Sequence, residues 1–250
     1  MDPDLFLPAP IGHDAHDDDR KSASNRASGN TVKLIIFDFD GTLVDSRSLI
    51  LESHRIVFAE FGMPAPSPAH SLSLVGKSLD VILAELAGPA APILEMVRAY
   101  DLLLPRLRAD PAFAEIPFDG AGDLLHELSR TPATVLGLAT GHRSDTVAPA
   151  LEALQWDAFF RTIQAADTAP SKPHPAMLLQ ALAATGTEAK DAIFIGDTTF
   201  DMQMAQSAGL RSLGVSWGYH QAERLLAAGA HSIAQSVDEL RTSIRSALAD

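Results

Sequence analysis

The chain has 250 residues, 46% of them hydrophobic and 20% charged, so it can bury a core as one domain with an insertion or as two small domains. No segment approaches the roughly 20 apolar residues that cross a bilayer, and no signal-peptide pattern opens the chain, so we expect neither membrane association nor secretion. The net charge of −13 makes nucleic acid a poor partner, because the phosphates would be repelled. The absence of cysteine excludes disulfides, thiolate metal sites and cysteine catalysis, and we expect a cytoplasmic protein.

Residues 1–30 are expected to form a disordered tail. The segment contains several prolines, a run of aspartates and a small polar stretch, and it cannot bury enough apolar surface to offset its ordering entropy. His13 and His16 stand close to the aspartates, but a solvated tail is favoured over a metal site because nothing there would hold the ligands in place.

From residue 32 onward, apolar runs alternate with helical patterns. The runs predict short buried strands at residues 32–37, 134–139, 192–195 and 212–215, with weaker ones at 162–165 and 231–234. The helical patterns lie at residues 121–130, 144–154, 176–184, 200–208, 222–228 and 237–248. This alternation predicts right-handed βαβ units and therefore an α/β fold, a Rossmann-like parallel sheet flanked by helices.

Residues 46–116 break this rhythm. They contain no credible strand but three helical stretches, at residues 48–61, 78–86 and 93–107, which are separated by a proline-rich segment at 64–68 and by Gly88-Pro89. We expect a helical cap domain at 46–116, inserted into a core domain made of residues 31–45 and 117–250.

Two aspartates follow the first predicted strand, in Asp38-Phe39-Asp40-Gly41-Thr42. Residues two apart in an extended chain face the same side, so Asp38 and Asp40 are expected to project together from the carboxyl edge of the sheet, where open α/β sheets bind ligands. Two neighbouring carboxylates repel one another without a cation. The alternative interpretation is a pair of turn or capping aspartates.

Three further motifs follow predicted strands or lie in neighbouring loops. Thr140-Gly141 offers a hydroxyl and an unhindered backbone amide for a phosphate oxygen, although Thr-Gly alone is typical of any turn. Lys172, which precedes a proline, is a point charge suited to phosphate, but a solvated loop lysine is the simpler interpretation of that motif alone. Gly196-Asp197 begins a second acidic motif that ends at Asp201.

The last motif adds a candidate metal ligand. Mg²⁺ prefers few carboxylates, several waters and a substrate phosphate, and Asp38, the Asp40 carbonyl and Asp197 could supply the protein ligands. In the alternative interpretation, Asp197 or Thr198 caps the helix that follows.

The order and placement of these motifs resemble the haloacid dehalogenase superfamily, in its phosphatase branch with an α-helical cap after the first strand. The resemblance runs from about Val32 to the C-terminus and is carried by Asp38 to Ser46 (DFDGTLVDS) and by Gly196 to Asp201 (GDTTFD). Within the superfamily the chain looks most like the phosphoglycolate-phosphatase type. Residues 1–30 have no counterpart there, and Gly141-His142 follows Thr140 where many members have Asn next.

The resemblance implies a role for each matching residue. Asp38 would be the nucleophile that forms an aspartyl-phosphate, and Asp40 the general acid and base. Thr140 and Lys172 would hold the phosphate. Asp197 would bind Mg²⁺, and Asp201 would support the metal site from behind.

Three alternatives to a phosphatase stay open. A dehalogenase of the same fold lacks the second aspartate, present here as Asp40. A phosphomutase of the β-phosphoglucomutase type carries a cap histidine twelve residues after the nucleophile, where this chain has Ile50, with His54 one turn further on. A non-catalytic binding or regulatory pseudo-phosphatase is disfavoured by the complete set of acids, hydroxyl and lysine.

The expected partner is a small phosphorylated metabolite, with no nucleic acid and no membrane, and with the chain acting as a monomer or homodimer. Its specificity should lie in cap loops around residues 74–78. Lys77 in this loop could meet a substrate carboxylate or be solvated.

Overall fold

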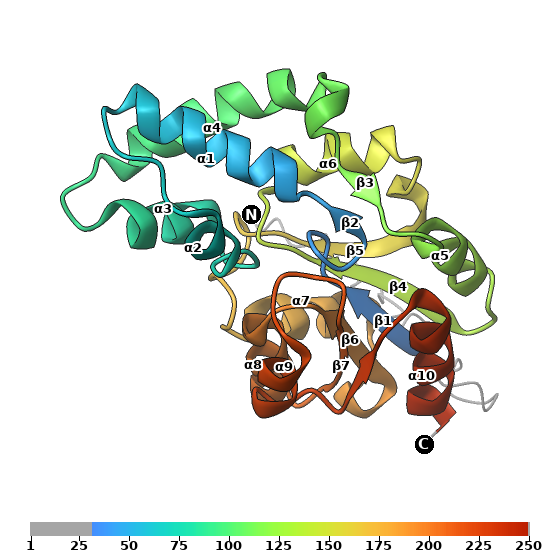
Figure 1. The fold of residues 1–250 in the computed structure, drawn as a ribbon. Coiled ribbons are helices and arrows are strands. Elements are labelled where there is room, and N and C mark those ends of the chain that lie inside the picture. Colours follow the sequence, from blue (N-terminus) through green and yellow to red (C-terminus); the bar gives the residue numbers. More distant parts are fainter. Residues whose placement is uncertain (1–31, 250) are drawn as a thin grey trace, which may run out of the picture. The chain divides into compact units, whose positions relative to one another are not determined.

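Residues 32–249 are described by a computed structural model, and the tail expected at 1–30 lies outside them. The main sheet has six strands in the order β5-β4-β1-β6-β7-β8, and all of their pairings are parallel (Figure 1). The strands are β1 (Lys33–Phe37), β4 (Thr134–Ala139), β5 (Phe160–Gln164), β6 (Ala192–Gly196), β7 (Arg211–Val215) and β8 (Ser232–Ala234). The predicted parallel α/β sheet is therefore confirmed, with ends that shift by one or two residues.

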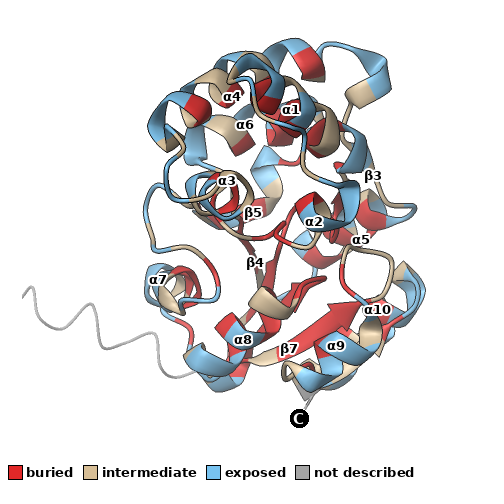
Figure 2. Cartoon of the chain, turned by 60° about the vertical axis from the view of Figure 1, so that its left-hand side comes forward, coloured by how far each residue is buried: buried red, intermediate tan, exposed pale blue. Residues whose placement is uncertain are grey.

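The continuous apolar sequence of β1 follows from its burial on both faces. Ile35 and Phe37 join a cluster with side chains of α5 (Ala121–Ser129), α6 (Ser144–Ala153) and α10 (Val237–Ala249). Leu34 and Ile36 point to the other face and join side chains of α7 (Ala176–Thr185) and α8 (Thr199–Ala208). Figure 2 shows the strands buried between helices whose outer surfaces are exposed.

The strand order places the carboxyl ends of β1, β4 and β6 next to one another. The chain passes from β1 to β4 and β5 on one side, and then returns to β6, β7 and β8 on the other side of β1. The helix α9 (Ala222–Ala227) and the short 3₁₀ turns η1 (Pro111–Phe113), η2 (Asp157–Phe159) and η3 (Ala189–Asp191) complete the connections. The loops after β1, β4 and β6 therefore meet at the reversal of strand order, where ligands bind in such sheets.

The segment after β1 is helical, as expected. It contains α1 (Arg47–Glu60), α2 (Pro68–Leu72), α3 (Leu79–Ala87) and α4 (Ile93–Arg108). Side chains of α1, α3 and α4 form a hydrophobic cluster of their own. Its status as a separate cap domain with the boundaries 46 and 116 stays a prediction.

Two details of this segment were not predicted. The antiparallel pair β2 (Val44–Asp45) and β3 (Ile116–Pro117) joins the two ends of the helical segment, so residue 116 belongs to a strand. These strands are two residues long, too short to leave a periodic pattern. The helix α2 begins inside the proline-rich stretch that was expected to separate helices, because Ser67 accepts a hydrogen bond from His70 N and Pro68 occupies the first turn, where proline is tolerated.

The helices of residues 32–249 include none that is both long and apolar enough to cross a membrane.

Candidate active site

A buried lysine stands between two acidic motifs at the carboxyl edge of the sheet. The Nζ of Lys172 lies 2.7 Å from Asp38 Oδ1 and 2.8 Å from Asp201 Oδ1. Lys172 is 1% exposed and Asp38 is also 1% exposed, so these ion pairs are shielded from water. The interpretation of Lys172 as a solvated loop residue is therefore wrong.

Asp197 is held in place by hydrogen bonds to both of its carboxylate oxygens. Thr42 Oγ1 donates to Oδ1 at 2.9 Å, and the backbone N–H of Tyr219 donates to Oδ2 at 2.8 Å. Two glycines make room for this carboxylate, because a Cβ on Gly41 would lie 2.3 Å from Asp197 Oδ2 and one on Gly218 would lie 2.2 Å from Asp197 Cβ. Gly41 also has a φ of +77°, which glycine adopts without strain.

Asp201 caps the helix α8 and also accepts a hydrogen bond from Lys172. Its Oδ2 accepts a hydrogen bond from Thr198 N at 3.0 Å, and Thr198 Oγ1 accepts one from Asp201 N at 3.3 Å, which forms a capping box at the start of α8. Thr198 Oγ1 also donates to Asp201 Oδ2 at 2.7 Å. Asp201 Oδ1 accepts from Lys172, so both oxygens already have protein partners. The helix cap that was considered for Thr198 is present, while Asp197 remains available to the site.

The three acids form an electrostatic arrangement that favours a cation. Ligand atoms of Asp38, Asp197 and Asp201 all lie within 4.8 Å of one another. Burial raises the pKa of Asp38 to about 7, although the Lys172 ammonium acts in the opposite direction. Burial also raises the pKa of Asp197 well above its ordinary value, and the negative charges of Asp201 and Asp38 add to this.

A divalent ion fits this set of residues. Three ionised carboxylates and one ammonium would leave a net charge of −2 in a buried site, which a divalent cation balances. In addition, Asp38 Oδ2 is buried and has no hydrogen-bond partner within residues 32–249. Asp38 and Asp197 are the residues that could bind the ion directly, with Asp201 behind them on Lys172.

The carboxylate of Asp40 belongs to a different cluster. Ser46 Oγ donates a short hydrogen bond to Asp40 Oδ1, and His142 Nε2 lies 2.7 Å from Asp40 Oδ2 as an ion pair. A carboxylate oxygen of Glu115 lies within 4.8 Å of the side-chain ligand atoms of Asp40 and His142. Burial would raise the pKa of Asp40, but the His142 charge and the hydrogen bond from Ser46 outweigh it and lower the pKa. Any metal contact of Asp40 through its carbonyl oxygen stays a prediction.

His142 and Asp40 shift each other's pKa in opposite directions. Burial alone would lower the pKa of His142, but the Asp40 carboxylate raises it above the ordinary value. The attraction between the two side chains therefore favours an imidazolium beside a carboxylate.

Thr140 and Gly141 lie where the motif order predicted, after β4. Thr140 is fully buried, and its Oγ1 accepts a hydrogen bond from His142 N at 3.1 Å. A Cβ on Gly141 would lie 2.3 Å from the carbonyl oxygen of Lys77, so glycine is required here by the close approach of another loop. The phosphate-binding roles of Thr140, Gly141 and Lys172 stay predictions.

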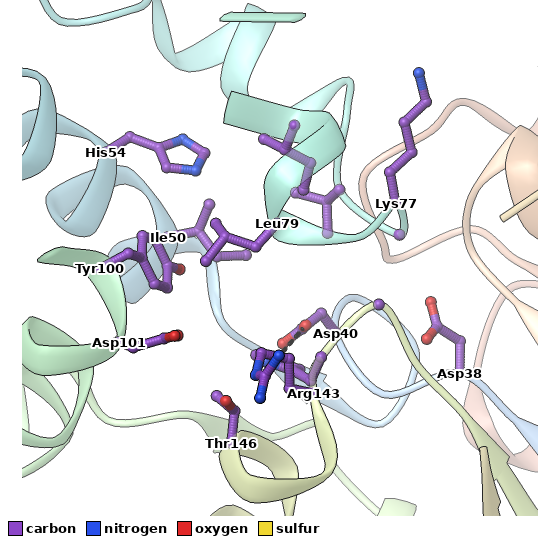
Figure 3. Close-up of a pocket in the computed structure, with 15 residues that line it drawn as sticks. Asp38, Asp40, Ile50, His54, Lys77, Leu79, Tyr100, Asp101, Arg143 and Thr146 are labelled. Atoms are coloured by element: carbon purple, nitrogen blue, oxygen red, sulfur yellow. Dashed lines mark ion pairs between the residues drawn. The ribbon is translucent and has the colours of Figure 1, made fainter. Parts of the chain in front are cut away.

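The loop at residues 73–78, which we call the cap loop, lies against the strand edge. Ser78 N donates to Ser171 Oγ at 2.8 Å, and the Nε2 of His220 is 3.1 Å from the carbonyl oxygen of Ser73. Between the cap loop, the helices α1 and α4, and the motif residues lies a small cavity of about 50 Å³ that opens to solvent (Figure 3). Asp38 and Asp40 line its lower side, and Ile50, His54 and Tyr100 line its helical side.

Sequence reasoning missed several residues of this site. Ser46 and Thr42 lie inside the first motif. Their polar side chains close to the acid pair in the sequence were the signal that could have identified them as site residues. His142 was noted as unusual after Thr140-Gly141 but was given no partner. Tyr219 acts through its backbone amide, and a backbone donor leaves no signal in the sequence.

Comparisons with known proteins agree with this geometry. Residues 35–215 match the family model described as haloacid dehalogenase-like hydrolase. The chain is 31% identical over 211 residues to the protein named Probable phosphatase IndB from Dickeya dadantii, which covers 83% of this chain and 91% of the relative. It is also 31% identical over 194 residues to Phosphoglycolate phosphatase 1 from Pseudomonas aeruginosa, over 75% of this chain and 71% of that protein.

A solved structure supports the same grouping. The haloacid dehalogenase-like hydrolase from Streptococcus pneumoniae superposes with a TM-score of 0.73 at 29% identity, covering 85% of this chain and 98% of the other.

Proposed function

Because the chain belongs to the haloacid dehalogenase-like hydrolase family and is a phosphatase, we propose that it hydrolyses a small-molecule phosphomonoester with Mg²⁺ through an aspartyl-phosphate on Asp38. The observation that carries this proposal is the environment of Asp38. One of its oxygens is held by Lys172, while the other has no hydrogen-bond partner in the described part of the chain, and the residue lines a cavity. Such a carboxylate is oriented for attack and lacks a competing donor.

The first step is attack of Asp38 on phosphorus, in line with the leaving alkoxide. The new bond joins a carboxylate oxygen to phosphorus, and the ester bond to the alcohol breaks. Phosphoryl transfer demands mainly positioning and neutralisation of charge, and the buried Lys172 ammonium supplies positive charge next to the nucleophile. Thr140 and the Gly141 amide are proposed to bind the transferred phosphate.

Asp40 is proposed to manage protons on the leaving-group side. A protonated Asp40 would give its proton to the leaving alkoxide and become a carboxylate. This carboxylate would then take a proton from the water that cleaves the acyl phosphate, which restores the protonated form. Ser46 and His142 fix its orientation, and they favour its carboxylate form, which the second step needs.

The metal would be held by Asp38, Asp197 and the Asp40 carbonyl, where it would neutralise and orient the phosphate. Asp201 would keep Lys172 between the nucleophile and the helix α8.

The alternatives are less well supported. At the position that would carry the phosphomutase histidine, Ile50 places an apolar side chain on the cavity wall. A dehalogenase would have no use for Asp40 with its Ser46 and His142 partners. A small phosphorylated metabolite as substrate, a monomer or homodimer, and a cytoplasmic location remain part of the proposal.

The test is hydrolysis of 4-nitrophenyl phosphate with Mg²⁺ and after exhaustive chelation. We expect turnover that needs the metal and that is lost in Asp38→Asn. Turnover that survives chelation, or that persists in Asp38→Asn, would contradict the proposal.

A further inference from the structure

Every cationic side chain that lines the cavity among the described residues already has an acidic partner. Lys77 Nζ lies 2.5 Å from Glu85 Oε1 and 4.6 Å from the centre of the Phe200 ring. Figure 3 shows the Lys77 side chain extending away from Asp38 and Asp40. The sequence-based option that Lys77 meets a substrate carboxylate is therefore not favoured by its position.

The other two cations are paired as well. Arg143 Nε lies 3.2 Å from Asp145 Oδ1, and His142 is paired with Asp40. A further acid, Asp101 of α4, lines the same cavity and is partly buried (Figure 3). The charge of Arg143 acts on Asp101 as well as on Asp145. A second anionic group on the substrate would thus compete with two carboxylates for one cation, which is costly away from bulk water.

The helical side of the cavity is largely apolar. Ile50, Val75, Leu79 and Ile82 line it, and Ile50, Val75 and Ile82 are each less than a tenth exposed. Each methylene that a ligand buries against such a wall is worth about fourfold in binding. The wall therefore favours a carbon skeleton over a charged group.

One polar side chain interrupts this wall. His54 is 2% exposed, its ring is tilted against that of Tyr100 at 6.1 Å, and its Nδ1 is buried without a hydrogen-bond partner anywhere in residues 32–249. Burial lowers the pKa of His54 to about 4, so the ring is neutral at pH 7. A buried unpaired imidazole that lines a cavity can be satisfied by a ligand.

We propose that the cavity selects phosphate esters of uncharged alcohols, whose carbon skeleton packs on the apolar wall and whose hydrogen-bonding group reaches His54. This inference rests on the proposed phosphatase function and specifies its substrate class. It sets this chain apart from what the name phosphoglycolate phosphatase says of a relative, because phosphoglycolate carries a carboxylate on its leaving group.

A pair of esters with the same number of carbons tests the charge argument. In 2-hydroxyethyl phosphate, a neutral CH₂OH group replaces the carboxylate of phosphoglycolate. We expect a kcat/KM about tenfold higher for the neutral ester, because of the like charge of Asp101 and because each cation of the cavity already has an acidic partner. Equal or better hydrolysis of phosphoglycolate would overturn the inference.

Variants identify the residues responsible. Asp101→Asn should raise kcat/KM for phosphoglycolate about threefold without the same gain for 2-hydroxyethyl phosphate. Glu95→Gln is the matched control, because Glu95 lies on the same helix, is exposed and loses the same charge. An equal change for both esters, or the same change in Glu95→Gln, would contradict the assignment.

His54 is tested by the loss and partial return of its hydrogen bond. His54→Phe should lower kcat/KM about tenfold for 2-hydroxyethyl phosphate and less than twofold for propyl phosphate, and His54→Gln should recover part of the difference. A circular dichroism spectrum checks that each variant is folded. Equal losses on both esters in the folded His54→Gln variant would contradict the role of His54.

Acetyl phosphate separates this inference from the proposed function, because its small leaving group hardly reaches the apolar wall. Hydrolysis of acetyl phosphate that depends on Asp38, together with a preference for phosphoglycolate, would overturn only the substrate class. No hydrolysis that depends on Asp38, whether of acetyl phosphate, of either ester or of 4-nitrophenyl phosphate, would overturn the proposed function and the inference with it.

Discussion

Replacing Gly141 with alanine tests whether the cap loop must lie against the strand edge for turnover. The added Cβ would be 2.3 Å from the Lys77 carbonyl oxygen and 3.0 Å from that of Gly76. Ordinary contact begins at 3.4 Å, so the cap loop has to retreat by about 1.1 Å, the difference between 3.4 and 2.3 Å. Gly141 is not among the glycines with positive φ, so alanine adds no backbone strain.

The expected loss follows from this displacement. Because a misplacement of about 1 Å can cost on the order of 10²-fold, we expect kcat/KM for 2-hydroxyethyl phosphate to fall by about 10- to 100-fold in Gly141→Ala. The melting temperature should fall as well, because Leu74, Val75 and Ser78 of the cap loop are buried and lose contacts when the loop moves.

Steady-state kinetics and thermal unfolding measure the two quantities together. Gly122→Ala is the control, because its Cβ would meet Trp156 only at 3.5 Å, an ordinary contact, and alanine favours the helix α5 in which it lies. Normal kcat/KM in Gly141→Ala would refute the closure argument. So would an equal loss in Gly122→Ala.

Three further predictions concern the buried charges. Lys172→Met should abolish turnover. It should also lower the free energy of unfolding of the metal-free protein by about 3 kcal/mol at pH 8, because two buried carboxylates lose their positive partner. Denaturant titration measures this loss, and unchanged stability would contradict the prediction. Asp197→Asn should leave a folded protein whose melting temperature no longer rises with Mg²⁺, and an undiminished rise would place the ion elsewhere. In the unaltered protein, Mg²⁺ should raise the melting temperature more at pH 8 than at pH 5. The reason is that the pKa of folded Asp38 is raised from 3.8 to about 7, so the metal-free folded state loses stability as the pH rises through this window. The cation binds the ionised form of Asp38, which predominates at the higher pH. A pH-independent rise in calorimetry would count against direct binding at Asp38.

The fold was predictable because its signals are local. The sequence of β1 is apolar throughout since both faces of the strand are covered, and the motifs after β1, β4 and β6 meet because parallel strands end at one edge. The acids and the lysine of the candidate site could be proposed from the sequence for the same reason, since they follow strands or lie in neighbouring loops.

What could not be predicted depends on contacts between distant segments. Nothing near Asp40 in the sequence indicates that it pairs with His142, because that contact is made only when β4 lies beside β1. Gly141 was assigned to phosphate binding, and its contact with the Lys77 carbonyl needs the position of the cap loop. The burial of Lys172 likewise depends on Asp201, which lies 29 residues away along the chain.

The most direct test of the central claim is to trap phosphate on Asp38. An aryl phosphate has a good leaving group, so its first step scarcely needs an acid and should proceed in Asp40→Asn. The second step still needs a base, whose assistance is worth typically 10²–10⁴-fold, and Asp40→Asn lacks it. Rapid-quench kinetics of Asp40→Asn should then show a burst of the phenol product, and intact-mass measurement should show one phosphate added to the protein. Both should be absent in the double variant that also carries Asp38→Asn. A burst that survives Asp38→Asn, or slow turnover without any added phosphate, would contradict the account.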